Sequence, residues 1–315
     1  MKRLYSIYDF RVAPLTYDFV TAMAVSYCYF SKVLGGNVEP RINLILVVPS
    51  FRNVTDYEKE VARRGLNEQR FQNIILGTST LIENIRDIRI CKDLSDFPNF
   101  NQGDLVFPPT LNVNKIDYSK GMTQIPCNFI FFNAFVGGRP VHLFRRNSFS
   151  KNSPDRNRVS LSLRNSFQKP EREVSLEDWF DLYKAIKEKG KEVIVIPDHD
   201  DYFGPKKYLQ FDWVVNELAS HSIRERLVTY STCGFNIASP SGLNVLLMFS
   251  DNSFYIPGYL DSRYPTSNAS YMARKGPALN SQLFWFRNDQ RIGWQEFTEM
   301  KGSKLSDACI RYVFG

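Results

Sequence analysis

The chain has 315 residues, of which 43% are hydrophobic and 14% aromatic, and its formal net charge is +7. A single hydrophobic core rarely grows to this size, so two domains are expected. The mild basic excess suits an anionic ligand or a negative membrane surface, or is simply a solvated surface, and it does not by itself indicate nucleic-acid binding.

The cysteines predict a reducing compartment. They are odd in number and far apart, with no CxxC motif, which argues against a structural zinc site: Cys28, Cys91, Cys127, Cys233 and Cys309. The first ten residues are too polar for a signal peptide, and the longest apolar stretch, residues 19–30, is too short to span a bilayer. A soluble, cytoplasmic protein is therefore expected.

The first half of the chain alternates strand and helix patterns. Continuous aliphatic runs such as "INLILVVP" are typical of strands that are covered on both faces of a parallel sheet. The expected elements are a strand over 3–9, a helix over 17–34, a strand over 42–49, a polar-faced helix over 56–77 and a strand over 87–93. This βαβαβ order predicts an open parallel sheet.

The middle of the chain is less regular. Residues 127–136, "CNFIFFNAFV", read as another buried strand. Residues 145–158, "RRNSFSKNSPDRNR", are basic and rich in Ser and Asn, which is typical of a linker between domains. We therefore expect an N-terminal domain over 1–150 and a C-terminal domain over 151–315.

The second half restarts the alternation. Ser175 is placed to cap a helix that ends at Gly190, and Ile223, Leu227 and Tyr230 fall on one face of another helix. The expected elements are strands over 159–164 and 192–198, helices over 208–221, 222–233 and 307–314, and a strand–turn–helix–strand unit over 235–258. Both halves are thus predicted to be α/β.

The turn Ser239-Pro240-Ser241-Gly242 lies between a predicted strand and a predicted helix. In an open parallel sheet, ligands bind beyond the carboxyl ends of the strands, and a helix that begins there offers free N–H groups to a phosphate. Gly242 allows close backbone approach, and the two serine hydroxyls can donate hydrogen bonds. The turn is either a diphosphate-binding site or an ordinary strand-to-helix connection.

Residues 223–258 resemble the nucleotide-sugar half of GT-B glycosyltransferases, most closely the heptosyltransferase-type enzymes of bacterial surface-polysaccharide synthesis. In that family a helix and a short strand precede a "D-S-G-P"-like turn, which a helix and a strand follow. Here Pro240 replaces the acidic residue and Leu243 replaces the final proline. The resemblance implies two Rossmann-like domains facing a cleft, the first on the acceptor side and the second binding the nucleotide-sugar.

The resemblance also implies a set of donor-binding residues at the ends of three strands: Arg164, Asn165, Ser166, Asp198, Ser239, Ser241 and Gly242. Arg164 can make a bidentate phosphate contact, or can be a surface arginine. Asp198 begins the run "DHDD", which could face the nucleotide, hold a divalent ion or be structural. Because the family needs no catalytic metal, we expect no metal and no cofactor, with the nucleotide-sugar as substrate.

Inverting sugar transfer needs a general base near the acceptor hydroxyl. The resemblance places it after the first strand, which gives the catalytic candidates Asp18, Asp9 and Arg11. Asp18 could instead be a first-turn carboxylate that favours the helix dipole, and Asp9 could simply pair with Arg11, two residues on. His221 is expected to be structural and His142 stays undecided. The aromatic, polar stretch 258–276 is either a loop that closes over the ligand or an irregular surface loop.

The function that the resemblance implies is transfer of a sugar from a nucleotide-sugar to a glycan or glycolipid acceptor in bacterial polysaccharide synthesis. The expected partners are the donor and that acceptor, with peripheral contact at the inner membrane face as an option and no nucleic acid. Two alternatives stay open. One is a nucleotide-sugar 2-epimerase of the same fold, and the other is a non-enzymatic protein that binds anionic polymers through residues 145–158.

Overall fold

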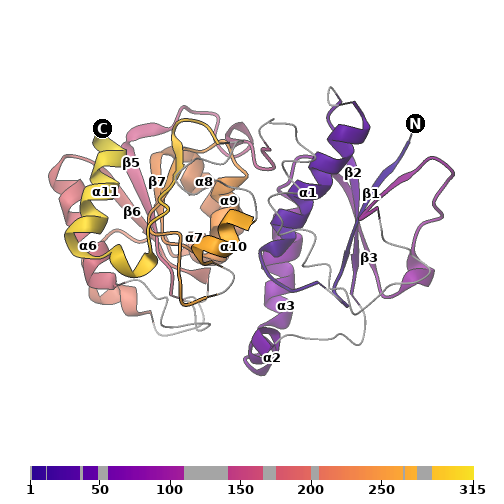
Figure 1. The fold of residues 1–315 in the computed structure, drawn as a ribbon, viewed down its shortest axis with the longest axis horizontal. Coiled ribbons are helices and arrows are strands. Elements are labelled where there is room, and N and C mark those ends of the chain that lie inside the picture. Colours follow the sequence, from indigo (N-terminus) through magenta and orange to yellow (C-terminus); the bar gives the residue numbers. More distant parts are fainter. Residues whose placement is uncertain are drawn as a thin grey trace. The chain divides into compact units, whose positions relative to one another are not determined.

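The computed structural model contains two compact units, Met1–Leu143 and Phe144–Gly315, each built on a parallel sheet (Figure 1). The described residues are 2–11, 13–35, 38–48, 56–109, 141–165, 175–199, 206–264, 267–274 and 286–315. The expected α/β class with two parallel sheets is confirmed. The division between the units falls slightly before the domain boundary predicted at residue 150.

The N-terminal sheet has the strand order β3-β2-β1-β4, and all of its pairs are parallel. Its strands are β1 (Leu4–Asp9), β2 (Ile42–Val47), β3 (Ile85–Cys91) and β4 (Leu105–Phe107). β1 is buried at every residue, as expected for a central strand of a parallel sheet that is covered on both faces. The three strands predicted in this half are confirmed.

Glycines follow the ends of two helices of the N-terminal unit. The predicted helix α1 (Asp18–Val33) is confirmed, and Gly35 follows it at φ 83°, a conformation that suits glycine. The single helix expected over 56–77 is wrong, because Gly65 at φ 69° ends α2 (Asp56–Arg63). The chain then continues through α3 (Asn67–Arg70), the π-helix η1 (Phe71–Leu76) and α4 (Gly77–Ser79).

The C-terminal sheet has the order β6-β5-β7-β8-β9, again with parallel pairs. Its strands are β5 (Asp155–Ser162), β6 (Glu192–Ile196), β7 (Cys233–Ala238), β8 (Phe254–Ile256) and β9 (Gln290–Ile292). β5 begins earlier than predicted, so the last residues of the proposed basic linker belong to this strand. In Figure 1, α6 and α11 lie on one side of the sheet and α8 on the other.

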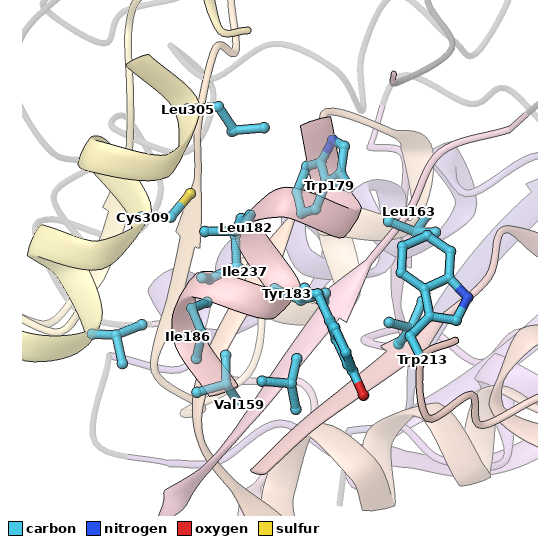
Figure 2. Close-up of a cluster of buried hydrophobic side chains, with 14 of the residues drawn as sticks. Val159, Leu163, Trp179, Leu182, Tyr183, Ile186, Trp213, Ile237, Leu305 and Cys309 are labelled. Atoms are coloured by element: carbon cyan, nitrogen blue, oxygen red, sulfur yellow. The ribbon is translucent and has the colours of Figure 1, made fainter. Parts of the chain in front are cut away.

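The main core of this unit lies between the sheet and two helices, α6 (Leu176–Glu188) and α11 (Gly302–Phe314). The Ser175 hydroxyl accepts a hydrogen bond from the Asp178 N–H at 3.2 Å, which confirms the predicted cap. Figure 2 shows side chains from both helices meeting those of the strands, among them Trp179, Leu182, Tyr183, Ile186, Leu305, Cys309, Val159 and Ile237.

The helix expected over 208–221 is wrong. Only its ends are helical, as η7 (Lys207–Gln210) and α7 (Leu218–His221). Between them the backbone pairs with the edge strand β6: the Val195 N–H donates to Val214 O, and the Asn216 N–H donates to Val195 O, both at 2.8 Å. Sheet pairing thus overrides a helix-like residue spacing.

Helix α8 (Ile223–Thr232) confirms the helix predicted over 222–233. The other remaining elements are short. They are η2 (Leu94–Asp96), η4 (Arg146–Ser148), η8 (Gly242–Asn244), α9 (Val245–Met248), α10 (Ala269–Arg274) and η9 (Phe297–Glu299). The strand predicted over 127–136 lies outside the described residues. Within the described part, none of the helices is long and apolar enough to cross a membrane.

Cys28 and Cys309 are buried free thiols, as predicted. Burial in apolar surroundings raises the pKa of both thiols above the ordinary value. Both side chains are therefore core residues.

Candidate functional site

The C-terminal sheet has a topological switch point between β5 and β7. Across the sheet, its strands come second, first, third, fourth and fifth in chain order, so the direction of winding reverses beside β5. Ligands of open parallel sheets bind beyond the carboxyl ends of the strands at such a point. Residues 164–165 follow β5 and residues 239–242 follow β7. The topology therefore brings together two of the three segments that were predicted to bind the donor.

Hydrogen bonds fix the turn after β7. The Ser239 N–H and hydroxyl both donate to Ser162 O, at 2.9 and 3.1 Å, and Ser239 is 1% exposed. Asn244 Nδ2 donates to Ser239 O at 3.1 Å, and the Ser241 hydroxyl donates to Asn244 Oδ1 at 3.4 Å. The Ser239 proton is thus used within the fold. Ligand contact at this turn is left to Gly242, which is exposed, and to Ser241, which is half-buried and would exchange its 3.4 Å hydrogen bond to Asn244 for one to a ligand.

The helix predicted after this turn is present, and it is short. The 3-10 turn η8 leads directly into α9, which ends at Met248. The helix ends there because the polar run 250–253 follows, and the Ser250 hydroxyl donates to Leu247 O at 3.0 Å. The strand–turn–helix–strand order predicted over 235–258 is therefore confirmed, with a helical segment of only a few residues. Such a short element has little macrodipole. A phosphate at this turn would therefore depend on hydrogen bonds from the backbone N–H groups of the turn.

The segments after β5 and β6 are joined to each other. The Asn165 N–H donates to Asp198 Oδ2 at 3.1 Å, and Asp198 is buried, as is Arg164. His199, which comes next, is 2% exposed, and its Nδ1 lies 3.1 Å from Ser220 O. Of the alternatives for Asp198, this geometry favours the structural one. The candidate Ser166 and the neighbouring Asp200 and Asp201 lie outside the described residues.

A buried arginine lies behind this edge of the sheet. Arg226, on α8, is 0% exposed. Its Nε donates to Ala219 O at 2.9 Å, its Nη2 to Pro197 O at 2.5 Å and its Nη1 to the Tyr230 hydroxyl at 3.3 Å. That hydroxyl also lies 2.9 Å from the Ser162 hydroxyl. The network thus connects α7 and α8 with the ends of β6 and β5.

Arg226 and Asn244 are not among the residues predicted from the sequence. Arg226 follows Ile223 by three residues and precedes Tyr230 by four, so it lies on the predicted apolar face of α8. A charged residue at such a position is a signal for a buried polar network. Asn244 had no comparable signal, because its role depends on the conformation of the turn.

The catalytic candidates of the N-terminal unit differ in how their carboxylates are engaged. Asp9, the last residue of β1, is 0% exposed. Arg11 Nε donates to Asp9 Oδ1 and Oδ2 at 2.9 and 3.0 Å, and Nη2 donates to Oδ2 at 2.5 Å. Asp18, the first residue of α1, is half-buried, and its Oδ2 accepts from the Thr16 hydroxyl at 2.9 Å. The pair that the two-residue spacing suggested for Asp9 is present, and Asp18 is the more accessible carboxylate.

The described residues hold no group of three or more His, Cys, Asp and Glu side chains that could bind a metal ion. The absence of a catalytic metal stays a prediction, because part of the "DHDD" run is not described. His221 ends α7 and, like His142, is half-buried.

Comparison with solved structures identifies the fold. A glycosyl transferase of family 9 from Veillonella parvula DSM 2008 matches with a TM-score of 0.50 and 8% identity, over 99% of this chain and 97% of that one. This chain shares the fold of that transferase. E. coli heptosyltransferase WaaC with ADP matches with a TM-score of 0.48 and 10% identity, over 98% of this chain and 99% of that one. E. coli ADP-heptose lps heptosyltransferase II matches with a TM-score of 0.44 and 11% identity, over 99% and 98%. No protein-family model and no curated protein matches the sequence.

Proposed function

We propose that this protein is a glycosyltransferase that moves a sugar from a nucleotide-sugar donor to a glycan or glycolipid acceptor. The observation that carries the proposal is the switch point between β5 and β7, where Arg164 and Asn165 follow one strand and the turn with Ser241 and Gly242 follows its neighbour. The shared fold with a family 9 glycosyl transferase supports this class of reaction. Bacterial polysaccharide synthesis is the process we propose for it.

In this proposal the donor diphosphate lies at the switch point. Arg164 supplies positive charge, and the Ser241 hydroxyl and the backbone N–H groups of the turn donate hydrogen bonds. Asp18 takes the proton of the acceptor hydroxyl as its oxygen attacks the anomeric carbon. The bond from that carbon to the diphosphate breaks, and the nucleoside diphosphate leaves. No metal takes part, so a chelator should leave the rate unchanged.

Calorimetry against ADP, UDP, GDP and CMP tests the donor site. We expect one nucleotide to bind, and Arg164→Ala to weaken it about ten- to a hundredfold, because a hydrogen bond to a charged group contributes about 1.5–3 kcal/mol. Arg224, which is exposed on α8, provides the control, and Arg224→Ala should bind as the wild type does. Absence of binding by any nucleotide at millimolar concentration would contradict the proposal.

Release of nucleoside diphosphate from the donor tests the base. Asp18→Asn should retain donor binding and lose about 10²–10⁴-fold in turnover, because the amide cannot accept the proton. Asp9→Asn breaks the buried pair with Arg11, so its melting temperature is measured beside its turnover. Full turnover in Asp18→Asn with a loss in a folded Asp9→Asn would move the role to Asp9.

The two alternative functions give different products in the same experiments. A nucleotide-sugar 2-epimerase would isomerise or hydrolyse the donor with no sugar on any acceptor. A binding protein for anionic polymers would bind a polyanion and no nucleotide. The residues 145–158 on which that alternative depends are partly within β5.

A further inference from the structure

Arg226 is a charged side chain placed entirely inside the C-terminal unit. It is 0% exposed, and its partners are two carbonyl oxygens and one hydroxyl. A buried charge destabilises a fold by several kcal/mol unless hydrogen bonds compensate, and an apolar residue would often serve stability equally well. The position of its partners therefore bears on why an arginine occupies this site.

Those partners lead to both sides of the switch point. Pro197, whose carbonyl accepts from Arg226, directly precedes Asp198, and Asp198 accepts from the Asn165 N–H. On the other side, the Tyr230 hydroxyl joins Arg226 to the Ser162 hydroxyl. The Ser162 carbonyl in turn holds the turn after β7 through two hydrogen bonds from Ser239.

We propose that Arg226 is a positioning residue for the donor site, acting through Pro197 and Tyr230. Its guanidinium fixes the end of β6 against the end of β5, and thereby sets the relative position of Asn165 and the turn after β7. A planar group with several donors in fixed directions can hold two segments in one relative position, whereas an ammonium is a compact charge on a flexible stem. Binding groups keep a productive geometry when such a supporting network locks them. The inference rests on the proposed function, since the ligand it serves is the nucleotide.

The hydroxyl of Tyr230 is the part of this network that can be removed with the least disturbance. Tyr230→Phe keeps the ring and breaks the connection between Arg226 and Ser162. Tyr183→Phe is a matched control, because Tyr183 is 2% exposed on α6, across the sheet, and its hydroxyl accepts from the Val214 N–H at 3.1 Å. Each substitution removes a buried hydroxyl from the same unit, so both should lower the melting temperature.

The affinity for a nucleotide distinguishes a residue that positions the donor site from one that only stabilises the fold. We expect Tyr230→Phe to weaken binding of the nucleotide selected from ADP, UDP, GDP and CMP about three- to tenfold, the range for one lost hydrogen bond. Tyr183→Phe should bind the nucleotide within about twofold of the wild type, because distant sites that share no partners rarely affect each other. Equal affinities in the two variants would overturn the inference, even if both are less stable.

Amide hydrogen exchange tests the positioning without any ligand. In Tyr230→Phe the N–H groups of Asn165 and Ser239 should exchange about tenfold faster than in Tyr183→Phe, because their hydrogen bonds lie along the network. Unchanged exchange at both amides would overturn the inference and leave the proposed function standing. If the two amides exchange faster in Tyr230→Phe but the wild-type protein binds no nucleotide, the proposed function is contradicted instead.

Discussion

The loop after β8 contains a carboxylate that is closed off from solvent. Asp261 is 0% exposed and pairs with Arg263, with Nε–Oδ1 and Nη2–Oδ2 distances of 2.9 Å, while the Arg263 side chain is 38% exposed. Arg263→Gln would leave the buried carboxylate without this counter-charge. We expect the free energy of unfolding to fall by about 3 kcal/mol, the lower end for a broken buried pair, because solvent reaches Arg263.

A second pair in the same unit has the same chemistry without the burial. Arg287 and Asp289 pair with Nε–Oδ1 and Nη2–Oδ2 distances of 3.1 and 2.9 Å, and their side chains are 40% and 48% exposed. Exposed pairs contribute about 0.2–1 kcal/mol, so Arg287→Gln should change the free energy of unfolding by no more than that. The two pairs share two short N–O contacts, so the main difference between the variants is the burial of the carboxylate.

Tryptophan fluorescence gives a clean measurement. All four tryptophans, Trp179, Trp213, Trp285 and Trp294, belong to the C-terminal unit, so urea unfolding followed by fluorescence reports on that unit. Adding Asp261→Asn to Arg263→Gln should restore most of the loss, because no buried charge is then left uncompensated. Equal losses in Arg263→Gln and Arg287→Gln would refute the reasoning.

Two further predictions follow from backbone conformation and from pKa. Gly258 has φ +64° and an added Cβ would lie 2.7 Å from Met300 Cγ, whereas Gly190 has φ +84° and nothing within 4 Å. In the same fluorescence assay, Gly258→Ala should therefore lower the free energy of unfolding by about 2 kcal/mol or more and Gly190→Ala by about 1. Equal losses would show that Met300 moves aside. Hydrogen bonds, first from the Arg3 side chain and next from the Asn101 N–H, lower the pKa of Asp104 to about 2. Because the folded-state pKa is lowered, the stabilisation is complete above the ordinary aspartate pKa and is lost as pH falls toward about 2. An NMR titration of Arg3→Met should show the midpoint returning toward the ordinary value, and an unchanged midpoint would assign the shift to backbone N–H groups.

The two Asp-x-Arg pairs show what sequence spacing can and cannot predict. The spacing of Asp9 and Arg11 suggested an ion pair, which is present, yet the same spacing at Asp261 and Arg263 was passed over. In both pairs the backbone N–H of the arginine also donates to the aspartate carboxylate, at 2.9 and 3.2 Å. The pair thus depends on a backbone turn that brings the two side chains together. The two-residue spacing alone does not predict that turn, because the turn depends on the backbone conformation.

In the C-terminal unit, two helices were predictable where apolar spacing and a cap agree. Ser175 and Ser222 accept hydrogen bonds from the N–H groups three residues on, and the helices that follow them were found from sequence. Residues 208–221 have apolar spacing without such a cap. Trp213 packs against the α6 core from extended backbone instead, and its Nε1 donates to Tyr208 O at 2.8 Å. Tertiary packing decided the outcome there, and no local signal records it.

The two faces of β5 divide stability from geometry. Val159 and Leu161 point into the apolar core with α6 and α11, and alternate residues of a strand point to opposite faces. On the α8 side, the Ser160 hydroxyl donates to Asn236 Oδ1 at 2.6 Å and the Ser162 hydroxyl bonds with Tyr230. Apolar contacts tolerate small shifts, whereas buried hydrogen bonds weaken steeply when their angles change. The polar face is therefore the one that can hold the carboxyl ends of β5, β6 and β7 in register, and it is the face that carries the network around Arg226.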